Sequence, residues 1–233
     1  MDAKRGYVPE DARNFAPEAL ETMRRASRHI CYLIDEGYDL KSASTFVGNH
    51  FLLSERQRLA VVRSIDPKEV MASRKAKERE TVPGGEVWID GFNTIITLEV
   101  LLSDSVLLTC MDGTIRDLAS LRGTYRIIPE TEQAVRMLFE TLQEMHVETA
   151  HILLDEPVSN SGRLKTLIAE IGEEYSVRPD IRILRDVDRA LWDCANVITS
   201  DSIILDHCIS WVNLMKYCLE KHPIKTYRVW EHA

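Results

Sequence analysis

The sequence predicts an α/β protein in which a parallel sheet follows a small all-helical domain. The first 75 residues carry helical apolar stripes separated by capping residues, whereas the rest alternates short apolar strands with amphipathic helices. A stretch dense in charge, residues 66–85, ends in Pro83-Gly84-Gly85 and separates the two patterns. We therefore expect a helical domain over residues 1–75, a linker over 76–85 and an α/β domain over 86–233.

The composition excludes several classes of protein. With 233 residues, 45% of them apolar and 28% charged, the chain can form a real core and does not have the composition of a disordered segment. No apolar run reaches the ~18–20 residues that span a bilayer, and the polar N-terminus does not resemble a signal peptide. Five scattered cysteines without a C-x-x-C pair argue for a reducing compartment. We expect a cytoplasmic protein without membrane contact, and whether it forms a homo-oligomer is left open.

Charge is distributed unevenly along the chain. Residues 1–81 hold 15 basic and 13 acidic side chains, whereas residues 82–233 hold 14 basic and 24 acidic ones. A strongly acidic half does not fit a protein that simply coats nucleic acid, because phosphate binding needs Lys and Arg. The excess of acids is compatible with a carboxylate group that binds a divalent metal ion.

Three helices are predicted in the N-terminal domain. The first carries an apolar stripe and ends near Gly37, a typical C-terminal cap; a second covers residues 40–47. The third begins at Ser54, with Gln57 completing a capping box, and continues to Ile65. Its Arg56, Arg58 and Arg63 are candidates for phosphate contact, but a solvated face of a packing domain is the favoured interpretation.

The second half predicts a parallel sheet. Strands are expected at residues 86–90, 151–155, 181–184 and 196–198, an apolar run covers 105–111, and helices are expected at 94–102, 130–145 and 162–175. Trp211 and Met215 lie at helical spacing and are expected in the core. Strands that alternate with helices form parallel sheets with helices on both faces, and ligands bind outside the carboxyl ends of such strands.

Acidic residues stand at or just beyond the ends of four predicted strands. They are Asp90, Asp155, either Asp186 or Asp188, and Asp201. Any one of them has an ordinary alternative role, because aspartates at strand ends often cap the next helix. Four carboxylates gathered at one sheet edge repel each other unless a cation neutralises them, and Mg²⁺ or Mn²⁺ suits such oxygen ligands. Metal-assisted phosphodiester hydrolysis is the chemistry natural to this group.

Two motifs resemble those of a known superfamily. The stretch Ile89-Asp90-Gly91-Phe92-Asn93 resembles the opening D-G-[YF]-N motif of the NYN branch of PIN-like ribonucleases. The stretch Asn196-Val-Ile-Thr-Ser-Asp201 resembles the late PIN element, a strand followed by Thr/Ser and Asp, and Asp155 and Asp188 match the intervening acids. The whole chain resembles a prokaryotic family that joins a small helical domain to a PIN-like domain.

The resemblance implies a PIN-like α/β sandwich and a Mg²⁺- or Mn²⁺-dependent endoribonuclease. It places Asp90, Asp155, Asp188 (or Asp186) and Asp201 around one or two metal ions, as both ligands and catalytic residues, with RNA as the partner. Asn93 would orient the first carboxylate or contact substrate. The alternative is a catalytically silent PIN-like module that binds RNA or a protein, for which we expect acids paired with arginines.

Three further features of the sequence bear on its chemistry. Ser159, Ser161 and Arg163 flank a predicted helix start and are candidates for binding substrate phosphate, with a plain capping loop as an equal alternative. The stretch Cys110-Met-Asp112-Gly-Thr resembles the haloacid-dehalogenase signature but lacks its first aspartate, so that chemistry is rejected. Asp112 and Asp117 remain candidates to approach the acid site, but a turn and a solvated helix are the favoured interpretation. The seven histidines show no zinc-binding spacing.

Overall fold

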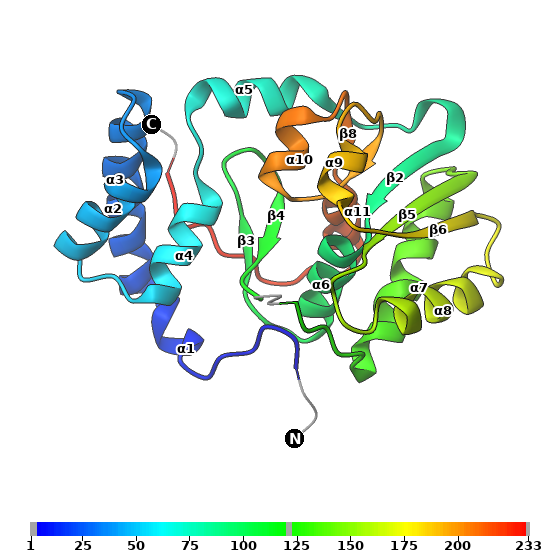
Figure 1. Ribbon diagram of the computed structural model, residues 1–233. Coiled ribbons are helices and arrows are strands. Elements are labelled where there is room, and N and C mark those ends of the chain that lie inside the picture. The colour runs from blue at the N-terminus through cyan, green and yellow to red at the C-terminus, as the bar shows by residue number, and fades with distance from the viewer. Residues whose placement is uncertain (1–3, 120–122, 232–233) are drawn as a thin grey trace.

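The computed structural model describes residues 4–119 and 123–231. Its N-terminal part is helical, and a six-stranded parallel sheet with helices on both faces follows (Figure 1). This confirms the predicted α/β class with a helical region in front. The N-terminal helices are α1 (Asp11–Asn14), α2 (Pro17–Asp35), α3 (Leu40–His50), α4 (Glu55–Ser64) and α5 (Lys68–Lys77).

Local signals set the ends of these helices. Gly37 adopts a φ of 87° just beyond α2, and its amide donates to the carbonyl of Ile34, as expected of a C-terminal cap. The capping box of Ser54 and Gln57 forms as predicted. Helix α3 continues past its predicted end through Gly48, where a Cβ atom would lie 3.0 Å from Cζ of Arg58. The small residue therefore lets an arginine pack against the helix.

The parallel sheet has the strand order β1-β8-β7-β2-β5-β6. Its strands are β1 (Glu78–Arg79), β2 (Glu86–Asp90), β5 (Thr149–Asp155), β6 (Arg178–Leu184), β7 (Val197–Ile198) and β8 (Trp211–Val212). From β2 the chain builds outward through β5 to β6, then returns to add β7 and β8 on the other side. This is doubly wound topology, and its switch point lies between β2 and β7.

Two short strands, β1 at the edge of the sheet and its neighbour β8, were not predicted. Strand β1 lies inside the predicted linker and pairs with β8, while Pro83–Gly85 of the same segment forms a 3₁₀ turn, η1. Trp211, expected on a helix, lies in β8; it is buried, as predicted. Strands of two residues carry too little periodicity to be recognised from sequence, because their pairing partners come from distant segments.

Helices cover the two faces of the sheet from opposite sides (Figure 1). Helices α6 (Gly91–Leu102), α7 (Pro129–Glu144), α8 (Ser161–Gly172) and α11 (Leu214–Lys221) pack on one face. Helices α9 (Val187–Leu191) and α10 (Ser202–His207) pack on the other. The side chains of strand β2 alternate between the two faces of the sheet. Val87 and Ile89 pack in the core beneath α6, α7, α8 and α11, and Trp88 packs against the core beneath α9 and α10.

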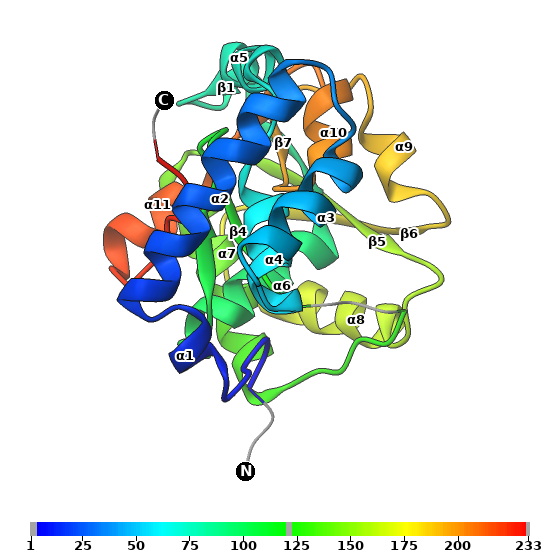
Figure 2. The ribbon, with the colours of Figure 1, turned by 90° about the vertical axis from the view of Figure 1, so that its left-hand side faces the viewer.

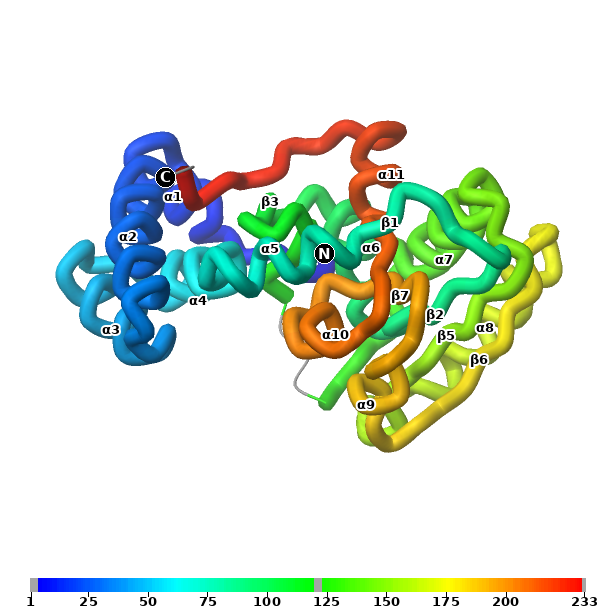
Figure 3. Tube along the Cα trace, turned by 90° about the horizontal axis from the view of Figure 1, so that it is seen from above, coloured from blue at the N-terminus to red at the C-terminus, as the bar shows by residue number. Residues whose placement is uncertain are grey.

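The helical region shares its core with later parts of the chain. The apolar run 105–111 forms β3 (Leu107–Thr109), which pairs antiparallel with β4 (Ile115–Asp117) outside the parallel sheet. Side chains of α2–α4 pack against this pair and against Val229 and Trp230. Figure 2 views the molecule from the side of these helices, and Figure 3 shows the C-terminal segment returning from α11 to α2. No helix in the described part of the chain has the length and apolar character to cross a membrane.

Candidate functional site

Four of the predicted acidic residues lie near the carboxyl edge of the sheet, beside its switch point. Asp90 is the last residue of β2 and Asp155 the last residue of β5. Asp201 precedes α10, three residues beyond β7, and Asp188 lies in the first turn of α9. Parallel strands carry their carboxyl ends to one edge, and this edge is where open α/β sheets bind ligands.

Asp90 is the buried member of this acid group. It is 6% exposed; its Oδ2 accepts a hydrogen bond of 2.9 Å from the hydroxyl of Thr199, and its Oδ1 faces the Asn93 amide at 3.5 Å. Burial raises the pKa of Asp90 to about 7; the hydrogen bond from Thr199 opposes this, and the charges of Asp201, Asp155 and Asp188 add to it. Asp90 therefore changes its charge near neutral pH.

Asp155 and Asp188 are more open to solvent. Burial raises the pKa of Asp155, and the charges of Asp188 and Asp186 raise it further. Burial, followed by the charges of Asp201 and Asp186, also raises the pKa of Asp188. The two candidates for the third acid have different surroundings. Asp186 caps α9 by accepting a hydrogen bond of 3.0 Å from the Arg189 amide. The charge of Asp188 contributes to the raised pKa of Asp90.

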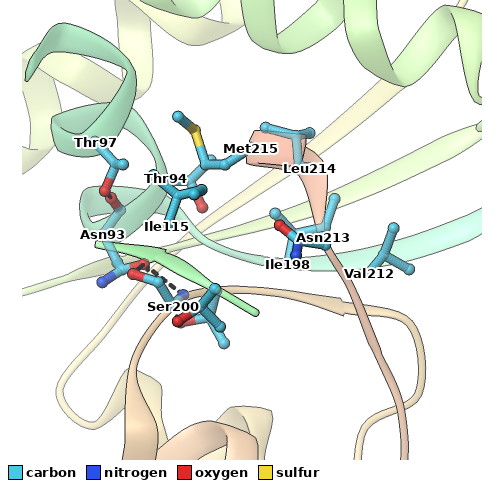
Figure 4. Close-up of a pocket in the computed structure, with 12 residues that line it drawn as sticks. Asn93, Thr94, Thr97, Ile115, Ile198, Ser200, Val212, Asn213, Leu214 and Met215 are labelled. Atoms are coloured by element: carbon cyan, nitrogen blue, oxygen red, sulfur yellow. Dashed lines mark hydrogen bonds between the residues drawn. The ribbon is translucent and has the colours of Figure 1, made fainter. Parts of the chain in front are cut away.

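The loop after β7 is tied to the start of α6. Oδ1 of Asn93 accepts hydrogen bonds from the amide of Ser200 at 2.8 Å and from its hydroxyl at 3.0 Å (Figure 4). Asp201 accepts from the amides of Ile203 at 2.8 Å and Ile204 at 3.3 Å, so it caps α10. Asn93 thus positions the segment that carries Asp201.

A small cavity lined by both polar and apolar side chains lies behind this loop. It has a volume of about 20 Å³, and Asn93, Thr94 and Ser200 are among its lining residues (Figure 4). A space of this size holds about one water molecule. Oγ1 of Thr94 is buried and has no hydrogen-bond partner among the described residues, which suits a cavity that admits water.

The four carboxylates fit a hard divalent cation by their chemistry. None of the ion pairs formed within residues 4–119 and 123–231 includes any of them, so their mutual repulsion is not offset by a cationic side chain. In the same residues, no three His, Cys, Asp or Glu side chains converge closely enough to form a ready coordination shell. Mg²⁺ is often held by one or two carboxylates together with water and substrate phosphate, so a site for this ion needs fewer than three protein ligands.

A second acid cluster, beside the first, is fully paired. The buried guanidinium of Arg74 contacts Asp66 at 2.7 Å, Asp112 at 2.9 Å and Asp206 at 2.7 Å. Arg116 donates to Asp112 and, over 2.8 Å, to the carbonyl of Ser200. Asp112 lies in a turn as predicted, but it is buried rather than solvated. This cluster joins α5, the β3–β4 turn and α10, and it reaches the Ser200 loop of the first.

Asp117 is not on a solvated helix as predicted. It ends β4, is buried, and accepts hydrogen bonds from the hydroxyl of Thr97 and the amide of Ala119, each at 2.8 Å. Burial raises the pKa of Asp117, while its bond with Thr97 lowers it. The antiparallel pairing of β3 and β4 brings this residue into the core.

The predicted phosphate loop contacts another part of the chain. Ser159 exchanges hydrogen bonds with the backbone of Tyr125, donating at 3.2 Å and accepting at 3.0 Å, and Asn160 donates to the same carbonyl at 2.7 Å. Ser161 begins α8, and Arg163 is exposed in its first turn. These contacts fasten the segment before α7 and do not cap α8, because its N-cap residue Asn160 makes no side-chain hydrogen bond to that helix.

The three arginines of α4 have distinct surroundings. Arg56 makes a two-point contact with Asp11, at 3.0 and 2.7 Å, and Arg58 donates to the carbonyl of Leu53 at 2.9 Å. Arg63 donates to the carbonyl of Asp117 at 2.6 Å.

Four residues of the site were not predicted from the sequence: Thr199, Ser200, Arg74 and Arg116. The first two stand inside the Asn196–Asp201 motif, but no local signal marks either arginine.

The chain is similar to one curated protein and matches two protein families. Over 186 residues it is 33% identical to "Uncharacterized protein MJ0935" of Methanocaldococcus jannaschii, a match that covers 79% of this chain and 89% of that protein. No solved structure matches the chain. A family described as "Protein of unknown function (DUF434)" matches residues 22–77. A second, described as "Domain of unknown function (DUF5616)", matches residues 79–217, more than half of the chain, and the protein therefore belongs to this family.

Proposed function

We propose that this protein is a metal-dependent endoribonuclease of the PIN-like type that acts in the cytoplasm. In this proposal Asp90, Asp155, Asp188 and Asp201 bind Mg²⁺ or Mn²⁺ and hydrolyse phosphodiester bonds of RNA. One observation carries the proposal: four carboxylates lie at or just beyond the switch-point edge of the sheet, charges within this group raise the pKa of Asp90, Asp155 and Asp188, and none of the four has an arginine or lysine partner among the described residues. The resemblance of the two flanking motifs adds support.

The side chains of this site have separate tasks in the proposed reaction. A divalent ion held by these carboxylates would activate a water molecule and supply positive charge to the phosphate. Thr199 fixes Oδ2 of Asp90 by its hydrogen bond of 2.9 Å, so this carboxylate would meet a bound ion in a set orientation. Asn93 and the cap of α10 fix the backbone around Asp201. Asp155 and Asp188, at the open side, are placed to meet metal and substrate from solvent.

The catalytically silent alternative predicts acids neutralised by arginines. Arg74 and Arg116 do this for Asp66, Asp112 and Asp206, but the four acids at the switch point lack such partners among the described residues. The protein thus carries a paired acid cluster that fits a structural role beside an unpaired one that fits a cation. The contrast favours the enzyme over the silent module.

A cleavage assay over a pool of mixed-sequence RNAs tests the proposal. We expect cleavage by the wild type in Mn²⁺ or Mg²⁺, none in EDTA, and a rate lower by about 100-fold or more in Asp90→Asn and Asp201→Asn. The matched control is Glu170→Gln, which removes the same charge from an exposed position on α8 and should cleave normally. RNA binding without cleavage by the wild type would support the silent module, and equal activity of Asp90→Asn would reject the site.

A further inference from the structure

A cleft joins the helical region to the acid group. It has a volume of about 280 Å³; Leu40, Val62 and Arg63 of α3 and α4 line one wall, and Asn93, Ser200 and Asp201 of the switch-point edge line the other. Because Asp201 and Asn93 belong to the proposed active site, the cleft is continuous with it. The N-terminal helices therefore form a wall of the region that an RNA strand would enter.

Two arginines line this cleft, and they differ in how their guanidinium groups are used. Arg116 is 7% exposed. Its guanidinium donates hydrogen bonds to the carbonyl of Ser200 at 2.8 Å, to the carbonyl of Arg63 at 2.6 Å and to the carboxylate of Asp112. The side chain of Arg63 is 36% exposed, and within the described residues its hydrogen bond comes from Nη1 alone, to the carbonyl of Asp117. Nε and Nη2 of Arg63 keep donors for a ligand.

The acidic residues of the cleft are largely engaged. Asp66 pairs with Arg74 at 2.7 Å and lies 3.7 Å from Arg116. Asp117 is held by Thr97 and Ala119 and lies 3.8 Å from Arg63. Asp66 has closer arginine partners, and Asp117 accepts from a hydroxyl and an amide. Neither carboxylate therefore occupies Nε and Nη2 of Arg63. The cleft thus presents one open guanidinium beside the proposed metal site.

We propose that Arg63 binds a backbone phosphate of the RNA next to the one that is cleaved, so that the N-terminal helices position the substrate in the acid site. This inference rests on the proposed function and deepens it. A guanidinium suits this task because its planar fork donates two parallel hydrogen bonds to phosphate oxygens. In an α/β domain rich in carboxylates, a cation supplied by a different part of the chain offsets the repulsion that the RNA backbone would otherwise meet.

The same helix offers a matched control for the test. Arg58 is on α4 as well, but its guanidinium packs against Gly48 and donates to the carbonyl of Leu53, away from the cleft. The experiment measures binding of a fluorescein-labelled single-stranded RNA 12-mer to the full-length protein in EDTA, which prevents metal-dependent cleavage, at several salt concentrations. The variants are Arg63→Gln, Arg63→Lys and Arg58→Gln, with thermal melts to check folding.

We expect Arg63→Gln to weaken RNA binding about tenfold and to reduce the slope of log K against log salt by about 0.7, the value for one phosphate contact on a single strand. Arg63→Lys should keep the salt slope while losing part of the affinity, because lysine retains the charge without the fork. Arg58→Gln should bind like the wild type. Equal affinity and slope in Arg63→Gln, equal losses in both glutamine variants, or no RNA binding by the wild type would overturn the assignment.

The failure of this inference can be told apart from failure of the proposed function. If Arg63→Gln loses affinity selectively but the wild type cleaves no RNA in Mn²⁺, then the phosphate contact stands and the nuclease assignment falls. If the wild type cleaves RNA but Arg63→Gln binds and cleaves it normally, then the nuclease assignment stands and the contact falls. In an active enzyme, Arg63→Gln should raise KM about tenfold with little change in kcat.

Discussion

The hydroxyl of Thr199 donates a hydrogen bond of 2.9 Å to the carboxylate of Asp90, and this contact links the two strands on either side of the switch point. The two residues are 109 positions apart in sequence. The same hydroxyl accepts from the amide of Asp201 at 3.0 Å, so one side chain connects two of the four acids. The geometry of the acid group therefore depends on the pairing of β2 with β7.

The titration of Asp90 predicts how stability depends on pH. Its folded pKa of about 7 lies above the ordinary value of 3.8, so between pH 4 and 7 the folded protein keeps a proton that the unfolded chain releases. Stability from this residue is therefore present at low pH and falls as the pH rises to about 7. Asp90→Asn removes this loss. In EDTA, the variant should gain stability over the wild type by a few kcal/mol between pH 4.5 and 8.

Urea unfolding at pH 4.5, 6, 7 and 8 measures this difference. Glu170→Gln, which changes an exposed acid, serves as the control and should follow the wild type at every pH. A difference between Asp90→Asn and the wild type that does not vary with pH would show that Asp90 is ionised throughout this range.

The third acid can be identified by comparing two neighbouring variants. Asp188→Asn removes a charge that acts on Asp90, Asp155 and the proposed ion, so RNA cleavage should fall by about 100-fold. Asp186→Asn should keep most activity, because asparagine caps a helix about as well as aspartate. The rates of both variants in saturating Mn²⁺ give the answer. Loss in Asp186→Asn with normal rates in Asp188→Asn would reverse the assignment.

Gly91 explains the glycine of the D-G-F-N motif in physical terms. A Cβ at this position would lie 2.6 Å from the side chain of Leu154 and 2.8 Å from the carbonyl oxygen of Leu153. Gly91→Ala should therefore lower the free energy of unfolding by about 1–3 kcal/mol, the usual cost of overpacking. Gly162→Ala is the matched control, since nothing lies within 4 Å of its Cβ, and it should be neutral or slightly stabilising. Urea unfolding compares the pair, and equal effects would refute the steric account.

Arg74 holds the helical region to the α/β region. Arg74→Ala would leave the buried carboxylate of Asp112 and its neighbour Asp66 short of a partner, so we expect a loss of about 3–5 kcal/mol in unfolding free energy. Lys75→Ala, next to it on α5, removes an exposed ion pair with Glu78 and should change stability by less than about 1 kcal/mol. Similar melting temperatures for the two variants would show that Arg74 does not stabilise this junction.

The sequence was informative where local signals suffice. Strand β2, its terminal Asp90 and the capping box at Ser54 each follow from patterns within a few residues. The pairing of Arg74 with Asp112 and the hydrogen bond of Thr199 to Asp90 could not be predicted, because each joins segments brought together only by the tertiary fold. The strands β1 and β8 were missed for the same reason, since two residues become a strand through their neighbour rather than their own periodicity.

Binding of Mn²⁺ at pH 8, followed by the electron paramagnetic resonance signal of the free ion, tests the central claim most directly. At this pH Asp90 is largely ionised, since its pKa is about 7. We expect the wild type to deplete the free signal, Asp90→Asn and Asp188→Asn to weaken binding about tenfold or more, and Glu170→Gln to bind normally. A free Mn²⁺ signal that the wild type leaves unchanged, or equal binding by the wild type and both aspartate variants, would contradict it.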